Sequence, residues 1–110
     1  MAALLPRLTV MSDIPRYSDA AFNVLQYDML QEKASSLAHH ARLVEQAMAA
    51  LHGATERDAE RPALVRKAAR EVWGYFVQRE VCGMRDHRDI IRDLRIPGEV
   101  LVRLGAMERD

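Results

Sequence analysis

The sequence contains little of what stabilises secreted proteins or anchors membrane proteins. A single cysteine, Cys82, cannot form a disulfide within the chain, which fits a reducing compartment. The apolar run that follows Met1 is broken by Pro6 and Arg7, so it is too short for the core of a signal peptide. No stretch approaches the roughly 18 apolar residues of a membrane-spanning helix. These absences predict a cytoplasmic protein that does not cross a membrane.

Aromatic residues, glycines and prolines are also scarce. Aromatics make up 5% of the 110 residues, which include five glycines and four prolines. The 16 basic residues equal the 16 acidic ones, so no overall field attracts the chain to nucleic acid or anionic lipid. Ala, Leu, Arg and Glu are abundant, and this composition favours helix over strand. We therefore expect an all-α protein, with a flexible tail over residues 1–17 and a single helical domain over 18–110.

Helix start and stop signals divide this domain. Ser18 is a good N-cap and Gly53 a helix-ending residue, and nothing between them interrupts a helix, so we predict one over about 19–52. Pro62 suits a first helical turn, and a second helix is predicted over about 62–82, before Gly83. The fold predicted from these signals is a long helical hairpin followed by two short C-terminal helices.

The two C-terminal helices are marked by weaker signals. Asp86 can cap the first of them. Ile96-Pro97 forces a break, because the residue before proline avoids the helical region. We expect the last helix over about 97–104, ending at Gly105.

The helix over 19–52 carries more apolar surface than one partner helix can cover. Its main stripe alternates three- and four-residue spacings and consists of Tyr27, Leu30, Ala34, Leu37, Ala41, Val44, Met48 and Leu51. A second set lies on the order of 100° around the helix and consists of Phe22, Leu25, Met29 and Leu43. The helix is also roughly 50 Å long, whereas a compact monomer of this size is about 34 Å across. We therefore expect the hairpin to form a homodimer, as a helix bundle.

The sequence has no recognisable catalytic, cofactor or metal site. It lacks a nucleophile–base pair, a phosphate-binding glycine loop and the Glu-x-x-His motif of di-iron bundles. His39 and His40 are adjacent on a helix, so their side chains diverge by about 100° and cannot share a metal ion. Cys82 lies at a helix C-terminus, the wrong end for an activated thiolate. We predict that the protein is not an enzyme and needs no cofactor.

Polar and aromatic side chains nevertheless concentrate at the end of the second helix. Arg79 falls on the apolar stripe of that helix, where an unpaired charge is costly. Two interpretations remain open, a buried Arg–carboxylate network that joins this helix to the C-terminal helices, or a small polar pocket. We favour the network, because such ion pairs are common in structural roles. The candidate residues are Trp73, Tyr75, Arg79, Glu80, Asp86 and His87.

Three functions are compatible with these features. The preferred one is a non-enzymatic homo-oligomeric module for interaction or regulation, whose partner is a second copy of the chain or another protein. The alternative is a nucleic-acid-associated regulator that uses the C-terminal helices or the face from Arg61 to Arg70. It is disfavoured because the arginines from Arg85 to Arg103 alternate with acidic residues. The third is a small-molecule binder around Tyr75, Arg79 and Glu80.

One segment also carries a likeness to other proteins. Its features are Trp73-x-x-Phe76-Val-Gln-Arg-Glu80, Cys82-Gly83, Arg85-Asp86 and Ile96-Pro97-x-Glu99-Val100. In these residues the chain resembles small all-α bacterial proteins of unknown function. The resemblance covers about a third of the chain, from 73 to 105. It implies a bacterial cytosolic setting and no particular chemistry.

Overall fold

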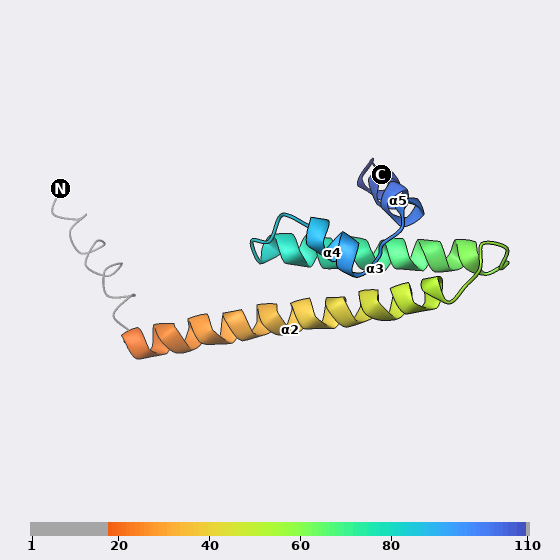
Figure 1. Ribbon diagram of the computed structural model, residues 1–110. Coiled ribbons are helices and arrows are strands. Elements are labelled where there is room, and N and C mark those ends of the chain that lie inside the picture. The colour runs from red at the N-terminus through yellow and green to blue at the C-terminus, as the bar shows by residue number, and fades with distance from the viewer. Residues whose placement is uncertain (1–17, 110) are drawn as a thin grey trace. The chain divides into compact units, whose positions relative to one another are not determined.

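The computed structural model describes residues 18–109, and its regular structure in this range is entirely helical (Figure 1). The helices are α2 (Asp19–His52), α3 (Arg61–Val81), α4 (Arg88–Asp93) and α5 (Gly98–Arg109). This confirms the all-α prediction, with a long helix, a shorter one and two C-terminal helices in the predicted order. The predicted tail over residues 1–17 lies outside the described residues.

The ends of α2 and α3 follow from local signals. At the start of α2, the Ser18 hydroxyl oxygen accepts a hydrogen bond from the Ala21 amide at 3.0 Å, as an N-cap does. Pro62 lies in the first turn of α3, where a missing N–H costs nothing. After α3, Gly83 adopts a φ of +88°, and the Met84 amide donates to the Arg79 carbonyl at 2.8 Å. This pattern is a Schellman motif, which ends a helix with a left-handed residue.

The C-terminal helices differ from the prediction in two details. Helix α5 continues past Gly105 to Arg109, whereas we expected it to end at Gly105. A glycine inside a helix costs only about 1 kcal/mol, and the good helix formers Ala106 and Met107 follow it. The N-cap of α4 is His87, which makes no side-chain capping bond. Asp86 acts one residue earlier, where its carboxylate accepts a bond from the Arg88 amide at 3.0 Å.

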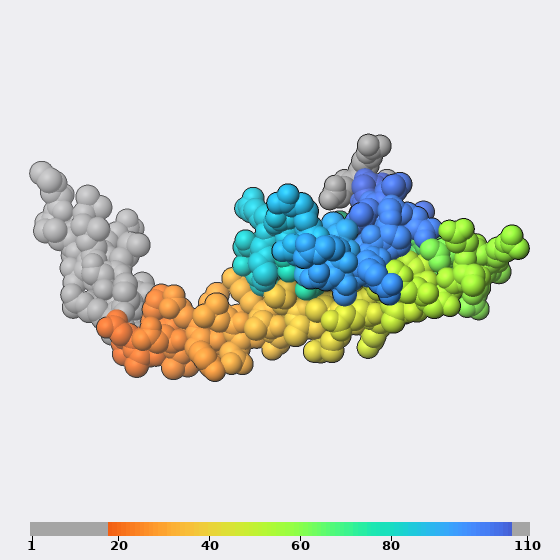
Figure 2. Space-filling view, in the orientation of Figure 1, coloured from red at the N-terminus to blue at the C-terminus, as the bar shows by residue number. Residues whose placement is uncertain are grey.

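The described chain forms two compact units, with the boundary after Ala34, inside α2. The first unit contains the part of α2 up to Ala34, where every described residue is exposed. The second unit begins at Ser35 and contains the rest of α2 with α3, α4 and α5. In this unit α3 runs antiparallel to α2, α5 packs against α3, and the Leu94 carbonyl at the end of α4 lies 3.2 Å from a ring nitrogen of His52 in α2 (Figure 1 and Figure 2).

The hydrophobic core belongs to the second unit. Helix α2 contributes Val44, Ala47, Met48 and Leu51, and α3 contributes Val65, Ala68, Ala69, Val72 and Tyr75. The C-terminal part of the chain adds Ile96, Val100 and Leu104, while Ile90, Ile91 and Leu94 pack at the edge. Ala68 and Ala69 are completely buried. Side chains this small allow neighbouring helices to approach closely.

The two apolar faces of α2 are covered within one chain only in the second unit. Of the predicted main stripe, Val44, Met48 and Leu51 are buried, and Leu37 and Ala41 are partly buried. From the second set, Leu43 is also partly buried. Hence both faces of α2 are at least partly buried within one chain in the second unit.

Gly74, in the middle of α3, permits a close approach to α2. A Cβ atom at this position would lie 3.4 Å from Nδ1 of His40. The His40 Nδ1 atom is itself buried and has no hydrogen-bond partner among the described residues. His40 therefore packs with its ring against the α3 backbone, and it does so at the expense of one unsatisfied polar atom.

Candidate interaction surface and polar cluster

The first unit presents a concentrated apolar surface on α2. Six large side chains in nine residues are between 58% and 65% exposed, and we call this set the N-terminal apolar surface: Phe22, Val24, Leu25, Tyr27, Met29 and Leu30. Exposed apolar residues that occur singly are normal, whereas a contiguous group of them marks an interaction site. The stretch therefore has the composition of a helix that is normally buried, although these six side chains are exposed.

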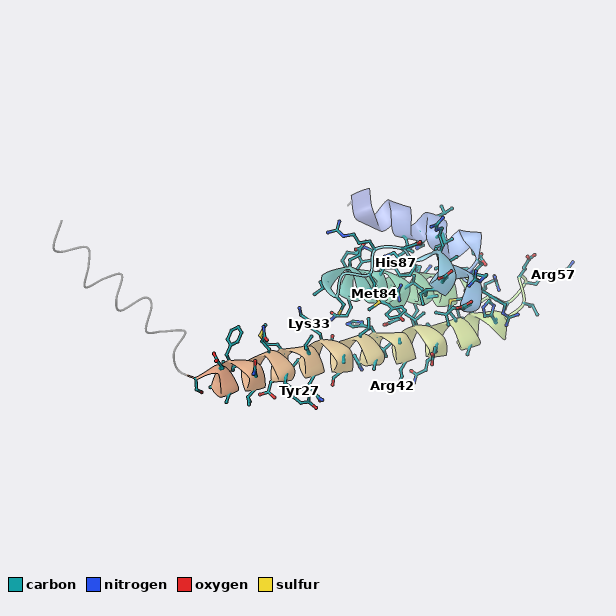
Figure 3. All side chains as sticks on the ribbon, turned by 60° about the vertical axis from the view of Figure 1, so that its left-hand side comes forward. Tyr27, Lys33, Arg42, Arg57, Met84 and His87 are labelled. Atoms are coloured by element: carbon teal, nitrogen blue, oxygen red, sulfur yellow. The ribbon has the colours of Figure 1, made fainter. Side chains whose placement is uncertain are left out.

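These side chains are distributed around α2. Phe22, Leu25 and Met29 follow one another at spacings of three and four, so they share one side of the helix. Tyr27 and Lys33 project from different sides of α2 (Figure 3). A helix with apolar residues on more than one side is normally covered by other parts of a protein. The main stripe predicted from sequence contributes Tyr27 and Leu30 to this surface. The second predicted set contributes Phe22, Leu25 and Met29.

The predicted polar residues meet in the second unit, where α3 ends and α4 begins. The Arg79 Nε group donates a hydrogen bond to Nδ1 of His87 at 3.1 Å, and its Nη2 group donates to the Asp86 carbonyl at 3.1 Å. Because Nδ1 of His87 accepts, its proton is assigned to Nε2, which lies 3.5 Å from a carboxylate oxygen of Glu80. The histidine thus links the arginine to the carboxylate, and we call these four residues the Arg79–His87 cluster.

Aromatic rings support the Arg79–His87 cluster from α3. The His87 ring stacks on Phe76, with centroids 4.1 Å apart and planes 4° from parallel. The guanidinium carbon of Arg79 lies 5.7 Å from the centroid of the Tyr75 ring, within the range of a cation–π contact. Arg79 and His87 are half-buried, so much of the Arg79 charge and of the hydrogen-bonding capacity of both side chains is shielded from water. Sequence analysis missed Phe76, although its place on the apolar stripe three residues before Arg79 was a usable signal.

The Asp86 side chain faces a different partner. Its carboxylate receives three bonds from the Arg88 guanidinium, at 3.0, 3.2 and 2.7 Å, besides the bond from the Arg88 amide. The side-chain bonds from Arg88, and next the amide bond, hold the pKa of Asp86 well below its usual range. Trp73 is 43% exposed and takes no part in the hydrogen bonds or stacking of the Arg79–His87 cluster. The structure therefore joins Tyr75, Arg79, Glu80, Asp86 and His87, but not Trp73.

The interaction around Arg79 differs from the direct Arg–carboxylate pair that the sequence suggested. Its partners are a histidine ring and a backbone carbonyl, and the carboxylate is reached only through His87. These bonds connect the end of α3 to the start of α4. The geometry is that of a structural junction, with the available donor and acceptor atoms directed at one another.

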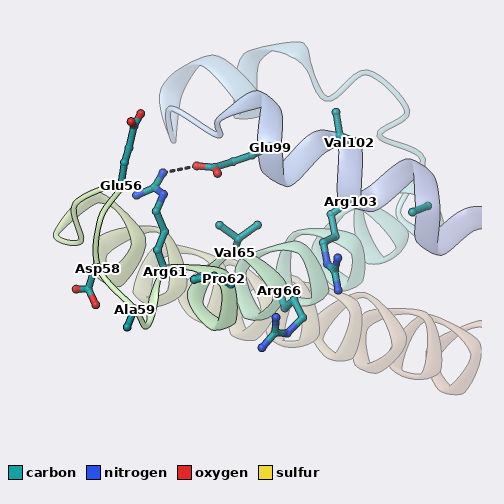
Figure 4. A pocket seen from close by; sticks show the side chains of 11 residues that line it. Glu56, Asp58, Ala59, Arg61, Pro62, Val65, Arg66, Glu99, Val102 and Arg103 are labelled. Carbon is teal, nitrogen blue, oxygen red and sulfur yellow. Dashed lines mark hydrogen bonds and ion pairs between the residues drawn. The ribbon is translucent and has the colours of Figure 1, made fainter.

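A separate groove lies between α3, α5 and the loop before α3 (Figure 4). It has a volume of about 660 Å³, and none of the six predicted site residues lines it. Arg61 forms an ion pair with Glu99 and donates to the Ala54 carbonyl at 3.1 Å. The charged residues around the groove are three arginines and three carboxylates, namely Arg61, Arg66, Arg103, Glu56, Asp58 and Glu99. This balance gives the nucleic-acid alternative little support, because phosphate binding requires an excess of positive charge.

Between residues 18 and 109, no group of three or more His, Cys, Asp or Glu side chains is placed to hold a metal ion. Within the same range, no helix combines the length and apolar character needed to cross a membrane.

Fold and surface together define a small all-α protein, a helical hairpin closed by two short helices, with an uncovered apolar stretch on its long helix. The chain belongs to the family of unknown function (DUF6665), whose profile matches residues 10–110. This confirms the resemblance to proteins of unknown function inferred from residues 73–105 and extends it over most of the chain, while the bacterial setting stays a prediction. No curated protein and no solved structure matches the chain.

Proposed function

We propose that the protein is a non-enzymatic homodimeric interaction module of the bacterial cytoplasm. In this proposal, the N-terminal apolar surface of one copy packs on that of a second copy. The observation that carries it is the exposure of six large apolar side chains between Phe22 and Leu30. The resemblance to bacterial proteins supports the proposed source, and the single cysteine supports a reducing compartment.

Burial of this surface supplies a driving force for association. Fully burying one large apolar side chain contributes about 1.5–3 kcal/mol. Association itself costs about 4 kcal/mol or more in lost translational and rotational freedom, so several such side chains must be buried together. A two-fold interface meets this requirement, because each side chain that faces the partner is buried twice, once in each copy.

Stability of the helix provides a second reason for a partner. A lone helix of about 12–15 residues is marginal in water, and most helical stability in proteins comes from packing of an apolar face. Residues 19–34 are helical although all of them are exposed. A second copy would stabilise this stretch by covering the side that contains Phe22, Met29 and Leu30.

Light scattering coupled to size-exclusion chromatography tests the proposal. We expect a dimer at micromolar concentration for the unmodified chain and a monomer for the double variant Phe22→Gln/Leu30→Gln. Val102→Gln is the matched control, because Val102 is an exposed apolar residue of α5 beside the groove, and this variant should remain dimeric. Thermal unfolding of all three proteins checks that the core of the second unit is intact. A monomeric unmodified chain, or a dimer that survives the double substitution, would refute the proposal.

A further inference from the structure

We propose that the two α2 helices of the dimer pair antiparallel, with Gln26 near the two-fold axis and Asp19 of each copy beside the partner's Lys33. This inference rests on the proposed homodimer and adds its orientation and register. It concerns residues 19–33, which all belong to the first unit of the structure.

The first step is that three polar residues share one line along α2. Asp19, Gln26 and Lys33 are spaced seven residues apart, and residues at this spacing lie nearly above one another on a helix. All three are exposed. Each residue of this line has neighbours of the N-terminal apolar surface at three or four residues, so the polar line runs through apolar surface rather than along a separate polar face.

Apolar residues also flank Gln26 at equal distances along the helix. Phe22 lies four residues before Gln26, and Leu30 lies four residues after it. Met29 lies three residues after Gln26, on the same side of the helix. A partner helix that packs along this line therefore contacts apolar side chains before and after Gln26, and it contacts a charged side chain, Asp19 or Lys33, at each end of the line.

The two possible orientations differ in which charges come together. In a parallel pair, Asp19 would face the partner's Asp19, and Lys33 would face the partner's Lys33, so both ends would bring like charges together. In an antiparallel pair centred on Gln26, Asp19 faces the partner's Lys33 at both ends of the contact. Opposite charges at the two ends select the antiparallel orientation.

The same centre also sets the register. It places Phe22 opposite the partner's Leu30, so that large apolar side chains meet on both sides of the axis. Gln26 then meets the partner's Gln26, and each amide can donate to the other because it holds both donor and acceptor groups. A slip of one turn along the helix would separate the charges and place a Gln26 amide against apolar side chains, where it lacks a partner.

Disulfide trapping distinguishes the two orientations. In a Cys82→Ser background, the variants D19C and K33C are oxidised separately and as an equal mixture, and cross-linked dimer is measured on non-reducing gels. The antiparallel pair predicts several-fold more cross-linking in the mixture than in either variant alone. Q26C is the control, since its two copies lie together in either orientation and should cross-link by itself.

Charge reversal gives a second readout that does not depend on oxidation. Lys33→Glu should weaken the dimer about tenfold, because it creates like charges at both ends, and Asp19→Lys/Lys33→Glu should restore the dimer. In a parallel pair the single reversal only replaces one like-charge pair by another, so the dissociation constant would not change. Efficient self-cross-linking of D19C, or an unchanged dissociation constant for Lys33→Glu, would overturn the antiparallel arrangement while leaving the dimer in place. A monomeric unmodified chain would instead refute the proposed function itself.

Discussion

The residues that follow α3 and α4 adopt the same left-handed conformation with different side chains. Gly83 has a φ of +88° after α3, and Arg95 has a φ of +51° after α4. Both complete a Schellman motif, since the Ile96 amide donates to the Ile91 carbonyl at 3.0 Å just as the Met84 amide donates to Arg79. A Cβ atom is unfavourable in this conformation, whereas glycine adopts it freely.

This contrast predicts that substitutions at the two positions change the free energy of unfolding in opposite directions. Gly83→Ala should lower the free energy of unfolding by about 1 kcal/mol, because a left-handed alanine costs roughly 1–2 kcal/mol and nothing lies within 4 Å of the new Cβ to confound the effect. Arg95→Gly should raise it by about 0.5–1 kcal/mol. Urea unfolding measures both, and changes of the same sign would contradict the assigned helix ends.

Asp86 gives a pH dependence whose sign follows from its partners. The Arg88 guanidinium and amide lower the pKa of Asp86 in the folded chain, so the folded state favours the ionised carboxylate. The resulting stabilisation is present above about pH 4 and is lost as the pH falls further, towards the pKa of the folded state. We therefore expect Asp86→Asn to reduce stability near neutral pH and to match the unmodified chain in strong acid. Thermal unfolding across this pH range checks it, and a penalty that grows on acidification would contradict it.

At the scale of elements, the junction of α3 with α4 depends on one histidine with two functions. His87 accepts the bond from Arg79 and stacks on Phe76. His87→Ala removes both interactions and leaves a half-buried guanidinium N–H without its acceptor, which should cost about 1–3 kcal/mol. His87→Phe keeps the stacking and should cost less.

A double-mutant cycle separates the junction from a binding pocket. If the Arg79–His87 cluster is structural, Arg79→Met and His87→Ala should be coupled by about 0.5–1.5 kcal/mol in urea unfolding. Additive effects on stability would show that the two side chains do not depend on each other, and the pocket interpretation would regain support.

Packing along α2 can be tested with two alanines. Ala41 is partly buried against the core, whereas Ala49 is exposed. Ala41→Leu inserts extra carbon atoms into a filled contact and should cost about 1–3 kcal/mol. Ala49→Leu should change the free energy of unfolding by no more than about 0.5 kcal/mol. Equal effects at the two sites would mean that the buried face of α2 has been misassigned.

At the scale of the whole molecule, the two units should respond differently to protein concentration. The second unit contains the hydrophobic core, whereas residues 19–34, the helical part of the first unit that the structure describes, are all exposed. Hydrogen exchange of the amides in residues 22–33 should therefore slow as concentration rises through the dissociation constant, because dimerisation protects them. The amides of α3 from Ala68 to Val72 should show no such dependence on protein concentration, provided that the stability of the core is the same at each concentration. Concentration-independent exchange in residues 22–33 would count against the dimer.

The sequence by itself determined the helices, because their ends depend on neighbouring residues. Ser18, Pro62 and Gly83 act within a few positions of a helix end, so the bounds of α2 and α3 were predicted to within one residue. Gly105 shows the limit of such signals, since a glycine weakens a helix without necessarily ending it. Residues 1–17 lie outside the described structure, so the predicted tail stays a prediction.

Only the tertiary structure decided which apolar residues of α2 are buried and which polar residues meet. Leu30 and Val44 belong to the same predicted stripe, yet Leu30 is 65% exposed and Val44 is completely buried. Periodicity identifies a face, but it cannot show how far along that face a shorter partner such as α3 provides side chains. The contact of His87 with Phe76 likewise joins residues eleven positions apart. It exists because the left-handed turn at Gly83 reverses the chain, and no spacing rule within one helix could predict it.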